Sequence, residues 1–168
     1  ALHTWHPNLN NTSASEHVPD IERHIRIIKD STHSTYCMLP FRRLPPIVLI
    51  HLVRNAVFWL NALPTNEAIT RQYSPQYIMT GQHITATKHT IIPFGAYVQA
   101  HETHNSNMGQ RTMSCICLGP TGNKQGGNYF VLLTSGKRVI QNHWTELPMP
   151  RDAITRVNLI GRKQNMPS

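Results

Sequence analysis

The run from Ile47 to Leu63 constrains the fold more than any other feature of the sequence. It is apolar around nearly the whole circumference of a helix, and Pro64 ends it. Such a helix is stable in water only when other elements cover several of its sides. Its length is near the lower limit for a membrane span, but it contains four residues that are costly in a bilayer, namely His51, Arg54, Asn55 and Asn61. The run therefore predicts a buried helix and no membrane partner.

A helix is predicted on either side of this run. The earlier one extends from Asp20 to about Ser31, where Ile21, Ile25 and Ile28 recur at helical spacing and mark one buried face. The later one is short, with Ser74 as N-cap, Pro75 in the first helical position and Gly81 as its stop. Prolines at 40, 45 and 46 separate the first helix from the long apolar one.

After residue 88 the pattern changes from helices to short strands. Four runs are rich in Ile, Val, Tyr and Phe and are separated by glycine-containing turns: Ile91–Ala100, Arg111–Leu118, Asn128–Thr134 and Lys137–Trp144. Ser135-Gly136 has the length of a two-residue hairpin loop. Strands at this spacing predict a small antiparallel β-barrel. A short last helix is predicted with Ile154, Val157 and Ile160 on one side.

These elements predict an α+β fold with four parts. Residues 1–17 are expected to be disordered or to be the broken end of a missing element. Residues 18–82 form a helical part, residues 90–148 a small β module, and residues 149–168 a C-terminal helix and tail.

The charge of the chain is basic and uneven. Sixteen Lys and Arg residues face eight Asp and Glu residues, which gives +8 with neutral histidine. Residues 64–168 contribute ten of the basic and four of the acidic residues. A basic protein attracts polyanions, of which nucleic acid is the commonest, so DNA is a candidate partner. A basic soluble domain that binds no nucleic acid is the competing interpretation.

The candidate DNA contacts are basic residues that lie close together in the sequence. Arg23, Arg26 and Lys29 fall on one side of the first helix, and Lys137 and Arg138 begin a strand. A basic helix face or strand end can lie against phosphates, although a solvated surface explains the same residues.

Three cysteines, Cys37, Cys115 and Cys117, form no disulfide framework and favour a reducing compartment, the nucleus or cytoplasm. Cys115 and Cys117, together with His101 and His104, are a candidate zinc set. The Cys-x-Cys spacing is too short for a zinc knuckle. Residues i and i+2 of a strand share a face, so both thiols can simply be buried.

Five segments follow one another along the chain, and each is similar to a short motif of one known protein family. They are Val18-Pro-Asp-Ile-Glu22-Arg-His-Ile-Arg, Phe58-Trp-Leu-Asn-Ala-Leu-Pro64, Ser74-Pro-Gln-Tyr-Ile-Met-Thr-Gly81, Phe94-Gly-Ala-Tyr-Val98, and Cys117-Leu-Gly-Pro followed by Gly126-Gly-Asn-Tyr-Phe130. Gly136-Lys-Arg-Val-Ile and Trp144 fit the strand that comes next. In this order the chain resembles a copia-type retrotransposon polyprotein, from the end of the integrase core into the region after it.

The chain also departs from the pattern of that family. The family's Asn-Gly before the acidic helix is replaced by Glu16-His17, and Pro19-Asp20 intrudes. The two upstream aspartates of the integrase metal site would precede residue 1, as would the family's zinc-binding His/Cys module.

The resemblance implies a ribonuclease-H-like core and Mg²⁺-dependent joining of element DNA to a target. Glu22 would be the third acid of the metal site, catalytic and Mg²⁺-ligating only if the missing aspartates are supplied. Arg23 and Arg26 would lie beside the DNA. One acid cannot hold two ions, so the isolated chain is expected to need no cofactor and to neither cut nor join DNA. Its partners would be DNA, the rest of the polyprotein and a second copy of itself. Two alternatives stay open: a retained basic DNA-binding module, and an inert translated relic.

Overall fold

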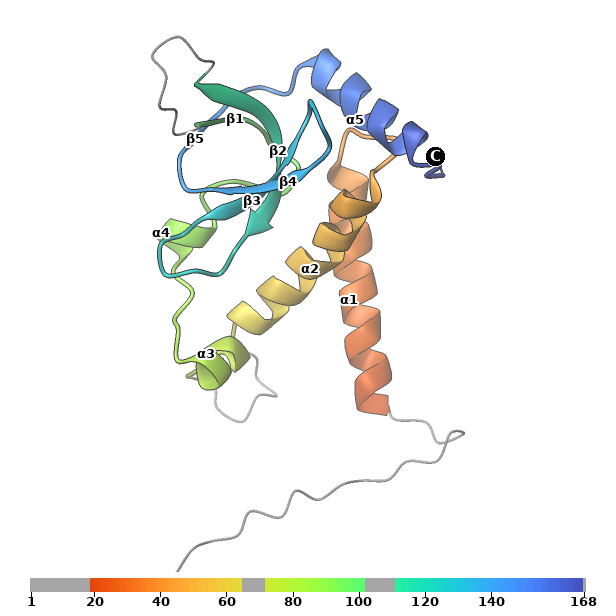
Figure 1. Cartoon of the computed structure of the whole chain (residues 1–168). Coiled ribbons are helices and arrows are strands. Elements are labelled where there is room, and N and C mark those ends of the chain that lie inside the picture. The colour runs from red at the N-terminus through yellow and green to blue at the C-terminus, as the bar shows by residue number, and fades with distance from the viewer. Residues whose placement is uncertain (1–18, 65–71, 102–110, 168) are drawn as a thin grey trace, which may run out of the picture.

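The computed structural model describes residues 19–64, 72–101 and 111–167, so the expectations for residues 1–17 lie outside it. The described chain is α+β, as predicted, with helices first, an antiparallel sheet next and a C-terminal helix last (Figure 1). None of the helices within these ranges combines the length and the apolar character that a membrane crossing requires.

The first helix, α1, spans Pro19–Met38 and continues well past its predicted end near Ser31. None of its residues is buried, so the predicted buried face of Ile21, Ile25 and Ile28 is wrong, and Ile21 and Ile25 are 58% and 47% exposed. The hydroxyl of Ser34 donates to the Asp30 carbonyl at 2.8 Å, and that of Thr35 donates to the Ser31 carbonyl at 3.0 Å. These polar side chains therefore bond inside the helix instead of starting a turn. No Gly or Pro interrupts the chain until Pro40, so the helix persists.

The long apolar run forms α2, Pro46–Ala62, within a residue of the prediction. Val48, Leu52 and Ala56 lie at i, i+4 and i+8 and are at most 4% exposed, and Val48 packs in one cluster with Ile116 and Leu118 of the sheet. α1 packs against another side of α2. Complete burial of each Val or Leu side chain stabilises the fold by about 1.5–3 kcal/mol. The prediction of a helix covered on several sides is confirmed.

The short helix α3, Pro75–Thr80, has both predicted caps. The Tyr77 N–H donates to the Ser74 hydroxyl at 3.2 Å. Gly81 ends the helix with φ 66°, and its N–H donates to the Tyr77 carbonyl at 2.8 Å. A further single-turn helix, α4 (Ala86–His89), was not predicted.

Five strands form one sheet in the order β4-β3-β2-β1-β5, with all neighbours antiparallel. Their bounds are β1 Tyr97–His101, β2 Thr112–Pro120, β3 Asn128–Leu132, β4 Arg138–Gln141 and β5 Trp144–Glu146. The predicted run Ile91–Ala100 becomes a strand only at Tyr97, because Pro93 cannot donate to a ladder and Gly95 has φ 84°. The run Lys137–Trp144 divides into two strands at residues 142–143.

Two details of the predicted β module were wrong. The sheet is open, because β4 and β5 are its two edges, so the predicted barrel does not close. The β3–β4 connection contains five residues, 133–137, rather than two, because β3 ends at Leu132 and β4 begins at Arg138. The longer loop lets Leu133 turn into the core, where it is 7% exposed, and the Gly136 N–H bonds back to the Leu132 carbonyl at 2.8 Å.

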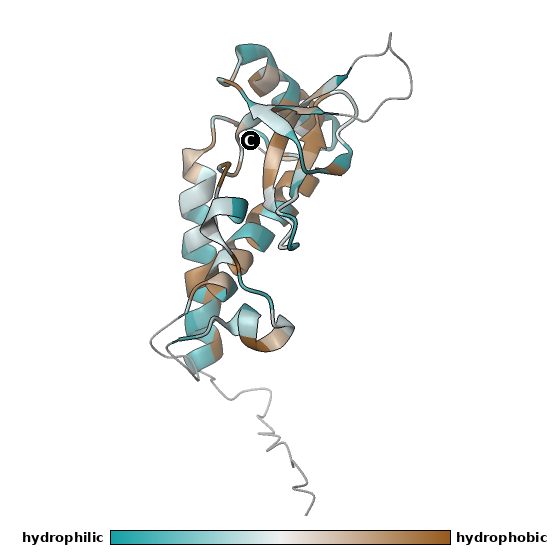
Figure 2. Ribbon diagram, turned by 90° about the vertical axis from the view of Figure 1, so that its left-hand side faces the viewer, coloured by the Kyte–Doolittle hydropathy of each residue, from teal (hydrophilic) through white to brown (hydrophobic). Residues whose placement is uncertain are grey.

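The sheet has a hydrophobic cluster on each face, because successive strand residues alternate between the two. One face has a cluster that contains Ile116, Leu118 and Val131 and packs on α2 and α5; we call it the outer cluster. The opposite face has a second cluster, called the inner cluster, which contains Val98, Cys117 and Phe130 and is covered in part by Trp144. Figure 2 shows hydrophobic residues gathered in the central strands.

The last helix, α5 (Arg151–Lys163), closes the outer cluster with Ala153 and Val157. The predicted Val157 is fully buried, whereas Ile154 and Ile160 are half-buried. The Asn158 side-chain oxygen accepts the N–H groups of Arg42 and Arg43, both at 2.9 Å. A Cβ at Gly161 would come within 2.8 Å of the Arg43 carbonyl oxygen, so only glycine permits this approach. The end of the chain thereby holds the connection between α1 and α2.

Candidate nucleic-acid interface

The predicted residues of the first helix all lie on its exposed surface. Glu22, Arg23, Arg26 and Lys29 are exposed on α1, whose N-terminal half extends away from the sheet (Figure 1). Arg23 forms an ion pair with Asp20 at 3.8 Å. An exposed pair of this kind contributes little to stability. The structure thus places these four residues on one helix, remote from the predicted pair Lys137, which precedes β4, and Arg138, which begins it.

Nothing in the described part of the chain completes a metal site around Glu22. Across residues 19–64, 72–101 and 111–167, no three His, Cys, Asp or Glu side chains converge closely enough to hold an ion. A two-ion phosphoryl-transfer site needs several converging carboxylates. The residues present therefore do not fit Mg²⁺ by themselves.

The candidate zinc residues are also separated. Cys115 and Cys117 are buried in the inner cluster of the sheet, and burial raises the pKa of these thiols to about 11 and about 12. His101 is exposed, with its Nε2 3.2 Å from the Thr145 hydroxyl oxygen, and His104 lies outside the described residues. Both thiols point to one side of β2 and behave as core residues, as the strand interpretation of their spacing predicted.

A cluster of one tyrosine and two arginines lies where α2 crosses the sheet. The Arg54 guanidinium carbon is 4.7 Å from the centre of the Tyr129 ring, and that of Arg138 is 5.2 Å from it. Arg54 Nη2 also donates to the Tyr129 hydroxyl at 3.1 Å. Tyr129 pairs with Ile140 across β3 and β4, which puts Arg138 diagonally beside it on the same face. Both arginines remain exposed, so their charges face solvent while their position is held by the ring.

The buried ring of His51 packs against the Tyr129 ring of this cluster. It is 2% exposed, and its ring centre lies 5.0 Å from that of Tyr129. Burial, followed by the positive charges of Arg54 and Arg138, lowers the pKa of His51 to about 4, although a hydrogen bond to the Leu118 backbone acts in the opposite direction. His51 is therefore neutral at pH 7, and the positive charge of the cluster resides on the two arginines at the surface.

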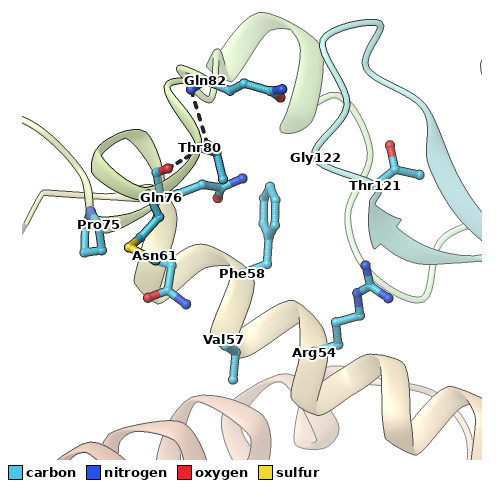
Figure 3. A pocket seen from close by; sticks show the side chains of 11 residues that line it. Arg54, Val57, Phe58, Asn61, Pro75, Gln76, Thr80, Gln82, Thr121 and Gly122 are labelled. Atoms are coloured by element: carbon cyan, nitrogen blue, oxygen red, sulfur yellow. Dashed lines mark hydrogen bonds between the residues drawn. The ribbon is translucent and has the colours of Figure 1, made fainter.

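A cavity of about 510 Å³ lies beside Arg54 and is bounded by α2, α3 and the β2–β3 connection (Figure 3). Its residues are mainly amides, hydroxyls and apolar groups: Arg54, Val57, Phe58, Asn61, Pro75, Gln76, Met79, Thr80, Gln82, Thr121 and Gly122. None of them is acidic. A Cβ at Gly122 would meet the Phe58 ring at 3.1 Å, and its φ of 81° also favours glycine. This close approach sets the width of the cavity on the sheet side.

Sequence reasoning found one member of the Tyr129 cluster and missed the rest. The sequence indicates Arg138 together with Lys137, which is exposed and directly precedes β4. Arg54 was considered only as a polar interruption of an apolar helix. That interruption was the available signal, because a lone arginine in a buried helix must lie where its guanidinium reaches water. Nothing in the sequence indicated that Arg54 meets Tyr129, a residue 75 positions away.

Chemically, the surface offers two guanidinium groups, one aromatic ring and a neighbouring set of amides. Guanidinium groups suit phosphate oxygens, and amides suit groups that both donate and accept hydrogen bonds. Comparison with known proteins returned no family model, no curated protein and no solved structure that matches this chain.

Proposed function

We propose that this chain is a nucleic-acid-binding segment of a copia-type retrotransposon integrase, covering the end of the ribonuclease-H-like core and the region after it. The observation that supports binding most directly is the pair Arg54 and Arg138, held on opposite parts of the fold against one Tyr129 ring. The order of the five sequence segments supports the integrase origin. In this proposal α1 and α2 are the last helices of the core.

Phosphate binding follows from how the two arginines are held. An exposed arginine normally loses side-chain entropy when it binds, and one already held by an aromatic ring loses less. Eight basic residues stand against two acidic ones in residues 111–167, so the surrounding potential also favours a polyanion. Contacts of this kind give affinity for any sequence and fix the position of the strand.

The isolated chain is proposed to bind DNA without cutting or joining it. Glu22 is exposed on α1, and no second and third ligand accompany it in the described ranges. Glu22 would act as a Mg²⁺ ligand only if aspartates from elsewhere in a longer polyprotein were brought to it.

Binding to duplex DNA across a salt series tests the proposal. Three variants would be compared with wild type: Arg54→Ala/Arg138→Ala, the α1 variant Arg23→Ala/Arg26→Ala/Lys29→Ala, and a control at the end of α5, Arg162→Ala/Lys163→Ala. Affinity of wild type should fall steeply with salt, by a slope of about 0.9 per phosphate contact. The Arg54/Arg138 variant should bind most weakly and show the smaller slope, while circular dichroism confirms that it is folded.

Three results would contradict this assignment. An equal loss in the α5 control would mean that total charge, rather than the Tyr129 cluster, determines binding. A larger loss in the α1 variant would place the interface on the first helix. If no variant and not even wild type binds at low salt, the chain is better described as an inert translated relic of an integrase.

A further inference from the structure

The cavity beside Arg54 has a composition that phosphate contacts alone do not require. Its volume, about 510 Å³, lies within the range of small-molecule sites. Three amide side chains line it from two directions: Asn61 on α2, and Gln76 and Gln82 on or after α3. Phe58 stands among them, between α3 and Gly122 (Figure 3). The cavity thus combines an aromatic ring with several groups that both donate and accept hydrogen bonds.

The hydroxyl groups in the cavity already form hydrogen bonds, whereas the side-chain amides bond to none of the described residues. Thr80 Oγ1 donates to the Gln76 carbonyl at 2.7 Å, and Thr121 Oγ1 donates to the Gly127 carbonyl at 2.8 Å. The side-chain amides of Asn61, Gln76 and Gln82 make no hydrogen bond to another described residue. They are partly exposed and therefore hydrated, so a ligand must replace that water with matching donors and acceptors. Heterocyclic bases offer such donors and acceptors along their edges.

From this arrangement we infer that the cavity holds one unpaired base of a nucleic-acid strand whose backbone phosphate lies on Arg54. This inference rests on the proposed function and adds a ligand to it. Arg54 contributes to both the cavity and the Tyr129 cluster, so a strand bound at the cluster would have its next base at the cavity mouth. Phe58 would provide stacking, and the amides would contact the base edge. An acidic side chain would repel the adjoining phosphate, and the lining contains none.

The test compares blunt duplex DNA with the same duplex carrying a short single-stranded overhang. The overhang should bind about tenfold more tightly, which is the usual order for one stacked base. Gln76→Leu/Gln82→Leu should remove that preference and leave binding of the blunt duplex unchanged, since neither residue belongs to the Tyr129 cluster. Gln164→Leu, at the end of α5, is the matched control and should preserve the preference. A fluorescent base analogue in the overhang should report stacking in wild type and lose that signal in Phe58→Leu.

The possible results separate this inference from the proposed function. Salt-dependent binding of both DNAs with equal affinity would overturn the base site and leave phosphate binding at Arg54 and Arg138 intact. A preference that survives in Gln76→Leu/Gln82→Leu would also overturn it. Failure of both DNAs to bind would overturn the proposed function and this inference together. Thermal unfolding of Phe58→Leu shows whether its loss of signal is local, and the glutamine variants decide the question if that variant is unstable.

Discussion

At the scale of single residues, three side chains in the described ranges have a buried polar atom without a hydrogen-bond partner, namely Thr32, His51 and Asn128. His51 Nδ1 and both side-chain polar atoms of Asn128 find no partner among the described residues, although these residues are 2% and 1% exposed. A buried polar group without a partner costs free energy relative to its hydrated state. The two residues differ in position, because His51 lies under the Tyr129 cluster while Asn128 lies at the start of β3.

The stability of the fold should depend on pH through His51. Its pKa is about 4 in the folded protein and 6.5 in the unfolded chain, so only the unfolded chain takes up the proton between these values. The free energy of unfolding is therefore highest above pH 6.5, and it falls by roughly 3 kcal/mol as the pH is lowered toward 4. Denaturant unfolding of wild type and His51→Phe at several pH values measures this. Parallel pH profiles for the two proteins would show that His51 is not responsible.

Asn128→Val should raise the free energy of unfolding by about 1 kcal/mol. The substitution removes two unsatisfied polar atoms from a buried site and places a β-branched side chain in a strand. Asn128→Asp, which buries a charge at the same position, should be strongly destabilising. Urea unfolding at pH 7 provides both values. A loss of stability in the valine variant would mean that the amide has a partner, such as an ordered water.

At the scale of elements, α1 is highly exposed and β2 is largely buried. No residue of α1 is buried, and its isoleucines 21, 25 and 27 are between 41% and 58% exposed. β2 is central in the sheet, and its last six residues are all buried. Few buried contacts permit local opening at low cost, whereas a central strand opens only when the sheet does. Each of these two elements contains cysteine, which makes the difference measurable.

A thiol reagent should distinguish the two elements in the native protein. Cys37, near the end of α1, is exposed and should react at once. Cys115 and Cys117 are buried with raised pKa values, so they should react only at denaturant concentrations that unfold the sheet. Mass spectrometry after brief labelling gives the extent at each cysteine. Cys37→Ser should remove the fast phase, and rapid native labelling of the other two would show that β2 is accessible.

At the scale of the whole molecule, the sequence predicted local structure better than assembly. The caps of α3 depend on Ser74 and Gly81 alone, and both were correctly identified. The length of α1 was underestimated because Ser34 and Thr35 bond within their own helix. The open edges of the sheet and the meeting of Arg54 with Tyr129 depend on packing between distant segments, which neither periodicity nor turn residues encode. Arg138 is identified by its basic neighbour in the sequence. The cavity at Phe58 is not, because it forms only where distant segments pack together.

The bonds from Asn158 to the backbone of Arg42 and Arg43 have a consequence for how the protein is made. A ribosome synthesises the α1–α2 connection more than a hundred residues before the side chain that holds it. Likewise, β1 pairs with β2 on one edge, but its other edge stays unpaired until β5 has been synthesised. The early helices must therefore leave the exit tunnel without their final partners, and translation that stops before α5 would release a chain unable to complete its core. The core is therefore complete only after α5 has been synthesised, and chaperones that bind apolar helices would act on α1 and α2 before that point.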